Sequence, residues 1–222
     1  MLYVVPTPIG NLEDMTYRAV RLLKEVDLVA CEDTRTSGVL LNHYGIATPR
    51  ISYHEHNEKR RAPELVQRMQ GGDRVALISD AGTPGVSDPG FYLVRECLRN
   101  DIQVEVLPGA TAMIPALVAS GLPCDRFVYE GFFPQKRGRA KRLEALVEEG
   151  RTIVLYEAPH RLVKTLGKLA ESLGADRPAA VARELTKKFE EVRRGTLQEL
   201  MEHYGASTKV RGECVIVIAG RP

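Results

Sequence analysis

The sequence predicts an α/β protein of two domains, because short apolar strands alternate with helical patterns from the first residues and this alternation changes near residue 120. The chain has 222 residues, of which 44% are hydrophobic and 27% are charged. This composition is typical of a folded protein rather than of a disordered one. At roughly 100–200 residues per domain, the length allows one large domain or two smaller ones.

The N-terminal half reads as repeated strand and helix units. Each expected strand is a short apolar run, and each expected helix carries apolar residues at three- and four-residue spacing. Such repetition predicts a mostly parallel sheet with helices on both faces. The elements expected are strands at 2–5, 27–31, 51–53, 75–78 and 104–107, with helices at 17–26, through 39–44, through 65–69 after a cap at Asn57, and at 91–99.

The pattern changes after residues 121–123. Three strands crowd into roughly the last 45 residues, which indicates a mixed or antiparallel sheet. The elements expected are strands at 127–129, 152–156, 179–183, 191–195 and 214–219, with helices at 139–149, near 162–173 and between the last two strands. We therefore expect an N-terminal α/β domain over residues 1–120 and a C-terminal mixed or antiparallel α/β domain over residues 121–222.

The charge is uneven along the chain. The net charge of +2 is too small to indicate a nucleic-acid partner, but residues 1–120 carry 12 Lys/Arg and 15 Asp/Glu, whereas residues 121–222 carry 19 and 14. A basic C-terminal half favours an anionic partner, although ordinary surface charge explains it equally well.

Cysteine usage and the chain start predict a cytoplasmic protein without a membrane partner. The four cysteines form no C-x-x-C pair and have no histidine at metal spacing, so we expect no metal site and a reducing compartment. The first residues lack the basic segment of a signal peptide. The uncharged stretch 106–124 is broken by Pro and Gly, so we expect a buried loop and helix rather than a membrane span.

Three loops rich in small residues follow expected strands of the N-terminal half, at 6–12, 79–90 and 108–112. Open α/β sheets bind ligands at the carboxyl ends of their strands, and small residues let a ligand approach the backbone. Gly and Pro also occur in ordinary loops, but three such loops favour a shared small-molecule site. The chain has neither a P-loop motif nor G-x-G-x-x-G after its first strand, so the commonest nucleotide-binding loops are excluded.

A series of short motifs runs along nearly the whole chain. They are P-x-G-N-L at 8–12, C-E-D-T-R at 31–35, S-D-A-G-T-P at 79–84, S-D-P-G at 87–90, P-G at 108–109, G-F-F-P at 131–134, Y-E-A-P-H-R at 156–161, R-E-L-T-K at 183–187 and G-E at 212–213. In this order they closely resemble the ribosomal RNA small subunit methyltransferase I family of the tetrapyrrole methylase superfamily.

The resemblance implies a tetrapyrrole-methylase-like fold, S-adenosylmethionine as methyl donor, and the 2′-hydroxyl of a decoding-region cytidine in small-subunit rRNA as acceptor. It also implies a homodimer and a cofactor cleft between the two lobes. The cofactor contacts it implies are Pro8, Asp80, Ala81, Gly82, Gly85, Thr111, Ala112, Tyr156 and Leu185. Backbone groups should dominate, because most of these side chains are small or apolar. C-methylating relatives carry a Gly-Gly-Asp turn where this chain has residues 80–82, Asp-Ala-Gly.

Methyl transfer to a ribose requires in-line alignment and stabilisation of the charge that develops on the hydroxyl. The resemblance brings Arg35, Glu184 and Lys187 toward one cleft, and we predict them as catalytic residues, with the cation oriented by the carboxylate. Two structural alternatives stay open. Asp33 or Thr34 can cap a helix, and the residues at 183–187 can form a structural ion-pair cluster. The sequence names no general base.

A basic run at 136–142 places five Lys or Arg within seven positions. Cations at a helix N-terminus oppose the helix dipole, so phosphate contact explains the run better than a solvated helix start does. We predict RNA contacts from Lys136, Arg137 and Arg139, together with Arg161. His54 and His56 share a strand face but have no third ligand, so a metal is not expected.

Three functions are compatible with these patterns. The first is an rRNA 2′-O-methyltransferase acting on rRNA within the assembled subunit. The second is a C-methyltransferase of a corrinoid or porphyrin precursor, and the third is a non-catalytic RNA-binding sensor of S-adenosylmethionine. The basic run and the C-E-D-T-R segment favour the first, because a porphyrinoid pocket calls for an apolar floor and fewer cations.

Overall fold

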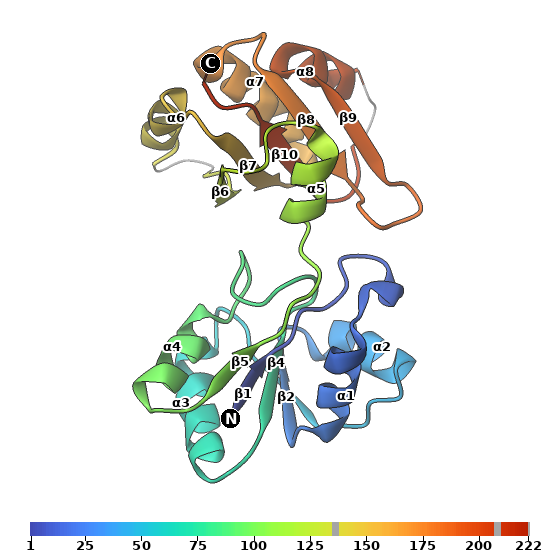
Figure 1. The fold of residues 1–222 in the computed structure, drawn as a ribbon, viewed down its shortest axis with the longest axis vertical. Coiled ribbons are helices and arrows are strands. Elements are labelled where there is room, and N and C mark those ends of the chain that lie inside the picture. Colours follow the sequence, from blue (N-terminus) through green and yellow to red (C-terminus); the bar gives the residue numbers. More distant parts are fainter. Residues whose placement is uncertain (135–137, 207–209, 222) are drawn as a thin grey trace. The chain divides into compact units, whose positions relative to one another are not determined.

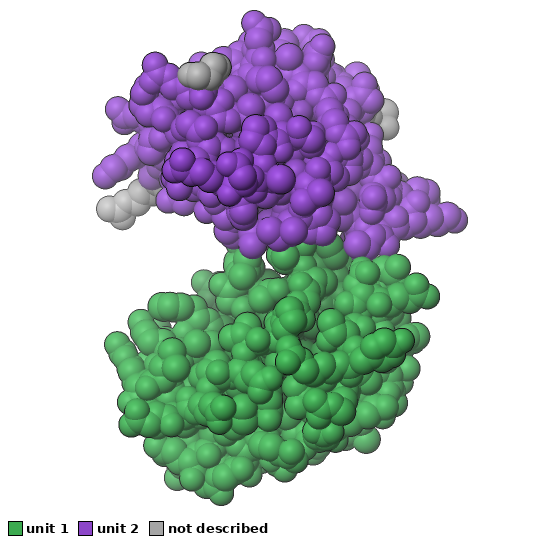
Figure 2. All heavy atoms as spheres, viewed as in Figure 1, with its two compact units in different colours: residues 1–111 green, residues 112–222 purple. Residues whose placement is uncertain are grey.

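Residues 1–111 and 112–222 form separate units in the computed structural model, which describes residues 1–134, 138–206 and 210–221 (Figure 2). We call them unit 1 and unit 2. The division falls ahead of the boundary expected at residue 120, because helix α5 (Met113–Ser120) packs against strands of unit 2. The apolar sequence of this helix did not reveal which unit it covers.

Unit 1 contains a five-stranded sheet in the order β3-β2-β4-β1-β5, and every neighbouring pair is parallel. The strands are β1 (Leu2–Val4), β2 (Leu28–Cys31), β3 (Arg50–Ser52), β4 (Val75–Ile78) and β5 (Val104–Val106). Strands β1, β2 and β4 are buried along their whole length, which is why they read as continuous apolar runs.

Helices cover both faces of this sheet, as predicted (Figure 1). Successive strand residues alternate between two cores, because side chains along a strand point to opposite faces. Leu2 and Val4 pack with the helices α3 (Glu58–Gln70) and α4 (Phe91–Arg99). Tyr3 and Val5 pack with α1 (Tyr17–Glu25) and α2 (Thr34–His43). The loop after β1 contains the 3₁₀ turn η1 (Leu12–Asp14).

Side chains cap two of these helices. At the start of α1, the Thr16 side chain accepts a hydrogen bond from the backbone N–H of Ala19. At the start of α2, the Asp33 side chain accepts one from the backbone N–H of Arg35. Asn57 precedes α3 but does not cap it, contrary to expectation. Its side-chain oxygen instead accepts a hydrogen bond from the backbone N–H of His54 at 2.9 Å, which closes the preceding turn.

Unit 2 contains a mixed sheet in the order β6-β7-β10-β8-β9. The pair β6–β7 is parallel and the other pairs are antiparallel, in line with the prediction. The strands are β6 (Phe127–Phe132), β7 (Thr152–Glu157), β8 (Pro178–Arg183), β9 (Glu191–Thr196) and β10 (Cys214–Ile218).

One face of this sheet packs against helices α6 (Arg139–Val147), α7 (Leu162–Leu173) and α8 (Leu197–Gly205), which share a core with alternate residues of β7, β8 and β10. The other face carries α5 (Figure 1). A 3₁₀ turn, η2 (Pro159–Arg161), connects β7 to α7.

The uncharged stretch 106–124 forms the end of β5, a loop and α5, as the sequence predicts, but it is not buried as expected, since Val106, Ile114 and Val118 are exposed. α5 is eight residues long and buries Ala116 and Leu117. Across residues 1–134, 138–206 and 210–221, no helix combines the length and the apolar character needed to cross a membrane.

Three of the four cysteines are buried, at Cys31, Cys97 and Cys214, and Cys124 is exposed. Burial raises the pKa of the Cys97 thiol to about 11 and that of Cys214 to about 12. Both thiols therefore stay protonated at neutral pH and behave as small apolar side chains.

Candidate functional site

The three glycine-rich loops of unit 1 form one connected rim. They follow β4, β1 and β5, which are neighbours in the parallel sheet, so the loops begin side by side. Thr7 and Gly82 exchange two backbone hydrogen bonds of 2.9 Å, which join the first loop to the second. The Thr83 hydroxyl donates to the carbonyl of Ala110 at 2.9 Å, which joins the second loop to the third.

Two glycines in this rim occupy places where a side chain is not accommodated. Gly109 lies against Pro6, and a Cβ at position 109 would come within 2.5 Å of the proline ring. Gly82 has a φ of +83°, and its Cβ would point toward Ile9 and the carbonyl of Ala110. Gly109 is exposed, so a ligand can approach its backbone closely, whereas Gly82 is buried and its N–H and carbonyl are both bonded to Thr7. Gly82 therefore holds the loops together beneath the rim.

Six residues of the predicted cofactor set belong to unit 1 and lie on these loops or at their ends: Pro8, Asp80, Ala81, Gly82, Gly85 and Thr111. Asp80 contributes the only carboxylate among them. Its Oδ1 accepts a hydrogen bond from the backbone N–H of Asp33 at 3.1 Å. Although Asp80 is exposed, partial loss of hydration raises the pKa of its carboxyl above the usual value. The second loop is thereby tied to the start of α2.

The other three residues of that set, Ala112, Tyr156 and Leu185, belong to unit 2. The Tyr156 hydroxyl accepts a hydrogen bond from the backbone N–H of Met113 at 3.2 Å. Its ring meets those of Tyr129 and Phe132 edge to face. Tyr156 therefore anchors the start of α5, a role that the sequence did not suggest.

The turn after β8 holds two residues in the left-handed region, Glu184 with φ 51° and Thr186 with φ 65°. Non-glycine residues there cost roughly 1–3 kcal/mol each and cluster at functional sites. This backbone brings the Glu184 carboxylate to 3.0 Å from the Lys187 ammonium, with side chains 19% and 41% exposed. Two of the three predicted catalytic residues therefore form an ion pair.

Gly212 supports this pair from a distant part of the sequence. A Cβ at position 212 would lie 2.0 Å from Oε1 of Glu184, and the backbone of Gly212 has a φ of +76°. Only glycine therefore leaves room for the Glu184 side chain. The G-E motif at 212–213 was visible in the sequence, but its contact with Glu184 depends on the fold.

Replacing Gly212 with alanine should displace Glu184 and lower methyl transfer by roughly tenfold or more, the scale of one disturbed electrostatic partner. Gly121→Ala is a matched control, because Gly121 has a φ of +74° and open space around its Cβ position. Both variants carry the same backbone strain, so the difference in their single-turnover rates isolates the contact with Glu184. Equal rates would contradict this role of Gly212.

The third predicted catalytic residue, Arg35, belongs to unit 1 and pairs with Asp33 at the start of α2. Asp33 accepts hydrogen bonds from the backbone and the guanidinium of Arg35, and these bonds lower the pKa of the Asp33 carboxyl to about 2. Asp33 therefore caps helix α2, which is the structural alternative considered for it. The Arg35 side chain is 90% exposed, and its catalytic role stays a prediction.

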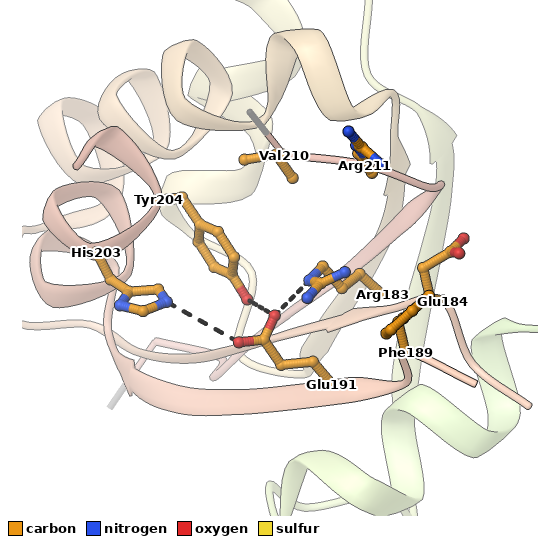
Figure 3. A pocket seen from close by; sticks show the side chains of 8 residues that line it. All are labelled: Arg183, Glu184, Phe189, Glu191, His203, Tyr204, Val210 and Arg211. Atoms are coloured by element: carbon orange, nitrogen blue, oxygen red, sulfur yellow. Dashed lines mark hydrogen bonds and ion pairs between the residues drawn. The ribbon is translucent and has the colours of Figure 1, made fainter. Parts of the chain in front are cut away.

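A pocket of about 520 Å³ opens in unit 2 next to Glu184 (Figure 3). Glu191 on β9 is its centre. The guanidinium of Arg183 donates to Oε2 of Glu191, and the hydroxyl of Tyr204 donates to the same oxygen at 3.4 Å. The residues that line the pocket are Arg183, Glu184, Phe189, Glu191, His203, Tyr204, Val210 and Arg211. Of these lining residues, the sequence pointed only to Glu184, as a catalytic residue, and to Arg183, as a member of an ion-pair cluster.

Comparison with known proteins identifies the family. The model of the Tetrapyrrole (Corrin/Porphyrin) Methylases matches residues 1–201. The chain belongs to the tetrapyrrole methylase family. It is 55% identical to a protein of Synechocystis sp. named Ribosomal RNA small subunit methyltransferase I, over 99% of this chain and 79% of that protein. A protein of the same name from Pseudomonas aeruginosa is 52% identical over 99% of this chain and 78% of its own length.

The fold of this tetrapyrrole methylase is also that of a solved relative. Uroporphyrin-III C-methyl transferase from Thermus thermophilus, complexed with S-adenyl homocysteine, superposes with a TM-score of 0.66 at 23% identity. The match covers 98% of this chain and 96% of that one. The predicted fold class and the resemblance to the ribosomal RNA small subunit methyltransferase I family are both confirmed.

The basic run of this methylase is only partly described. Lys136 and Arg137 lie outside the described residues. Arg139 begins α6 and stacks its guanidinium over the ring of Phe133, 5.4 Å from the ring centre. Arg142 forms an ion pair with Glu130. These two arginines therefore contact unit 2 itself, and RNA binding by the run stays a prediction.

Arg161, predicted as an RNA contact, compensates a buried charge. Its guanidinium lies 2.5 Å from Oε1 of Glu157, whose side chain is only 1% exposed. The hydroxyl of Thr165 and the backbone N–H of Ala158 also donate to this carboxylate, at 2.6 and 2.8 Å. The contacts of Arg161 are those of a structural residue at the β7–α7 connection.

Replacing Arg161 should therefore lower the free energy of unfolding of the protein. Arg161→Ala leaves the buried Glu157 carboxylate without its cation, which costs about 3–5 kcal/mol of unfolding free energy. The exposed pair of Lys168 and Glu171 on α7 supplies the control, because Lys168→Ala should cost less than about 1 kcal/mol. Urea denaturation measures both values, and a loss below about 1 kcal/mol for Arg161→Ala would show that the pair is not structural.

Residues in the described part of the chain do not assemble a metal site, since no three His, Cys, Asp or Glu are grouped suitably there. The rings of His54 and His56 lie 6.0 Å apart, centre to centre.

Proposed function

We propose that this chain uses S-adenosylmethionine to methylate the 2′-hydroxyl of a decoding-region cytidine in small-subunit rRNA. The observation that carries the proposal is the identity of 55% and 52% to two proteins named Ribosomal RNA small subunit methyltransferase I, over 99% of this chain. The matched region extends through both units and spans the turn at 183–187.

The glycine rim of unit 1 fits the cofactor. S-adenosylmethionine supplies an activated methyl group on a sulfonium, so the protein's task is to hold and align it. The rim offers exposed backbone at Ala81, Gly85 and Gly109, and Asp80 provides a carboxylate beside Ala81. Pro8, Gly85, Thr111, Ala112, Tyr156 and Leu185 complete the proposed set. A Cβ at Gly109 would collide with Pro6, which shows how closely the loops that form this rim approach one another.

The ion pair of Glu184 and Lys187 suits the acceptor. A ribose hydroxyl becomes a nucleophile as its proton leaves, and an ammonium group stabilises the charge that develops on its oxygen. Glu184 holds the Lys187 ammonium at 3.0 Å, and Gly212 leaves space for this arrangement. We assign Lys187 to charge stabilisation, Glu184 to its orientation, and Arg35 to the same reaction from unit 1.

The RNA and the assembly state complete the proposal. The basic C-terminal half, with Lys136, Arg137 and Arg139 in its basic run, suits the phosphates of rRNA. We propose the assembled small subunit as the substrate, a homodimer as the active form and the cytoplasm as the location.

Labelled S-adenosylmethionine tests the function directly. The protein is incubated with small ribosomal subunits from a strain that lacks the enzyme, with the rRNA extracted from them, and with a porphyrin precursor. We expect label on the rRNA of the subunits. Label on the porphyrin alone would establish a C-methyltransferase, and cofactor binding without any transfer would establish a sensor.

A further inference from the structure

We propose that the pocket centred on Glu191 receives the cytosine base of the acceptor nucleotide and that Glu191 reads its exocyclic amine. The inference rests on the proposed function and adds the residue that sets base specificity. The pocket belongs to unit 2 alone, and its volume of about 520 Å³ lies within the range of small-molecule sites, roughly 300–1,000 Å³.

Glu191 is held firmly by one of its two oxygens. Arg183 and Tyr204 both donate to Oε2, so the carboxylate has a fixed orientation in the pocket (Figure 3). Oε1 has a single close contact among the described residues, Nε2 of His203 at 3.9 Å, which is longer than a hydrogen bond. Oε1 therefore keeps the capacity to accept hydrogen bonds from a ligand.

The other lining residues complement a pyrimidine. Arg211 is exposed and, among residues 1–134, 138–206 and 210–221, makes no hydrogen bond or ion pair, so its five N–H donors are available. Phe189 is 67% exposed and offers an aromatic face of the kind on which unpaired RNA bases stack. The pocket thus presents a fixed acceptor, a free donor group and a stacking surface.

Cytosine matches this arrangement better than uracil does. The N4 amine of cytosine is a donor that a glutamate accepts, whereas uracil places the O4 acceptor at the same position. Arg211 can donate to the N3 and O2 acceptors of cytosine. A phosphodiester has no donor to offer Oε1 of Glu191, whereas the cytosine amine has, so the fixed acceptor favours a base over a phosphate group.

The pocket also lies beside the proposed chemistry. Glu184 lines it and is paired with Lys187. A nucleotide that places its base against Glu191 therefore carries its ribose toward the Glu184–Lys187 pair. Base recognition and hydroxyl activation would then use neighbouring side chains of a single unit.

The test compares small subunits that carry cytidine or uridine at the acceptor position. With the wild-type protein, we expect kcat/KM for cytidine to exceed that for uridine by about 10- to 100-fold, the discrimination of one well-formed base contact. In Glu191→Gln the ratio should fall below about threefold, because an amide can donate to O4 as well as accept from N4. Glu171→Gln, at an exposed position on α7, should leave the wild-type ratio unchanged.

A ratio in Glu191→Gln equal to the wild-type ratio would overturn the inference. If this variant does not fold, the wild-type protein is tested on subunits in which a pyrimidin-2-one nucleoside, which lacks the amine, replaces the cytidine. A rate at least about tenfold lower is expected there, and an unchanged rate would overturn the inference. Absence of transfer by the wild-type protein to any of these subunits would instead refute the proposed function, and the inference with it.

Discussion

Replacing Lys187 with alanine should lower single-turnover methyl transfer by about ten- to a thousandfold at saturating RNA, the scale of losing one preorganised electrostatic partner. The Lys187 ammonium lies 3.0 Å from Glu184, whose side chain is only 19% exposed, so the cation is held in place before the substrate arrives. Its loss removes the charge that stabilises the developing alkoxide. Arg35→Ala is expected to fall in the same range.

Two further measurements separate this role from simple packing. The affinity for S-adenosylmethionine should stay near wild type, because neither Lys187 nor Arg35 is assigned to the cofactor. Raising the pH should partly restore the rate of both variants if hydroxyl ionisation is what they lost. Lys164→Ala, at an exposed lysine of α7, serves as the control for removal of a positive charge. Full single-turnover activity in both variants would refute the assignment.

Gly82→Leu should abolish binding of S-adenosylmethionine. Gly82 is buried with a φ of +83°, and a side chain there would extend toward Ile9 of the first loop and the carbonyl of Ala110 in the third. The Leu side chain would therefore push apart the three loops that form the proposed cofactor rim. Titration calorimetry on the folded variant should detect no binding.

The matching control is Gly45→Leu, also in unit 1. Gly45 has a φ of +60° with open space around its Cβ position, so the variant carries comparable backbone strain away from the rim. It should bind the cofactor with wild-type affinity and lose a similar amount of stability. Unchanged affinity in the Gly82→Leu protein would place the cofactor elsewhere.

Much of the fold could be predicted because the spacing of apolar residues along the chain indicates which faces of each strand and helix are buried. Strand β4, for example, is buried on both faces and reads as a short apolar run, which is typical of a parallel sheet under two layers of helices. The unit boundary was harder to predict. α5 is apolar along most of its length, so its sequence does not show which sheet it packs against, and tertiary contacts alone place it in unit 2.

The candidate site could be predicted where its residues are close in sequence. Glu184 and Lys187 are three positions apart in one motif, and the fold joins them in an ion pair. Gly212 and Glu191 gained their roles from contacts with residues on other strands and helices, which no local pattern encodes. The ion pair of Arg161 with the buried Glu157 likewise depends on the fold, and the sequence did not reveal it.

Mass spectrometry of the nucleosides in modified rRNA tests the central claim most directly. Small subunits from a strain that lacks the enzyme are treated with the wild-type protein and S-adenosylmethionine, and the rRNA is digested to nucleosides. We expect one new product, cytidine methylated on its 2′-oxygen, and a strong loss of this product with Lys187→Ala. A methyl group on a base atom, or no methylated nucleoside at all, would contradict it.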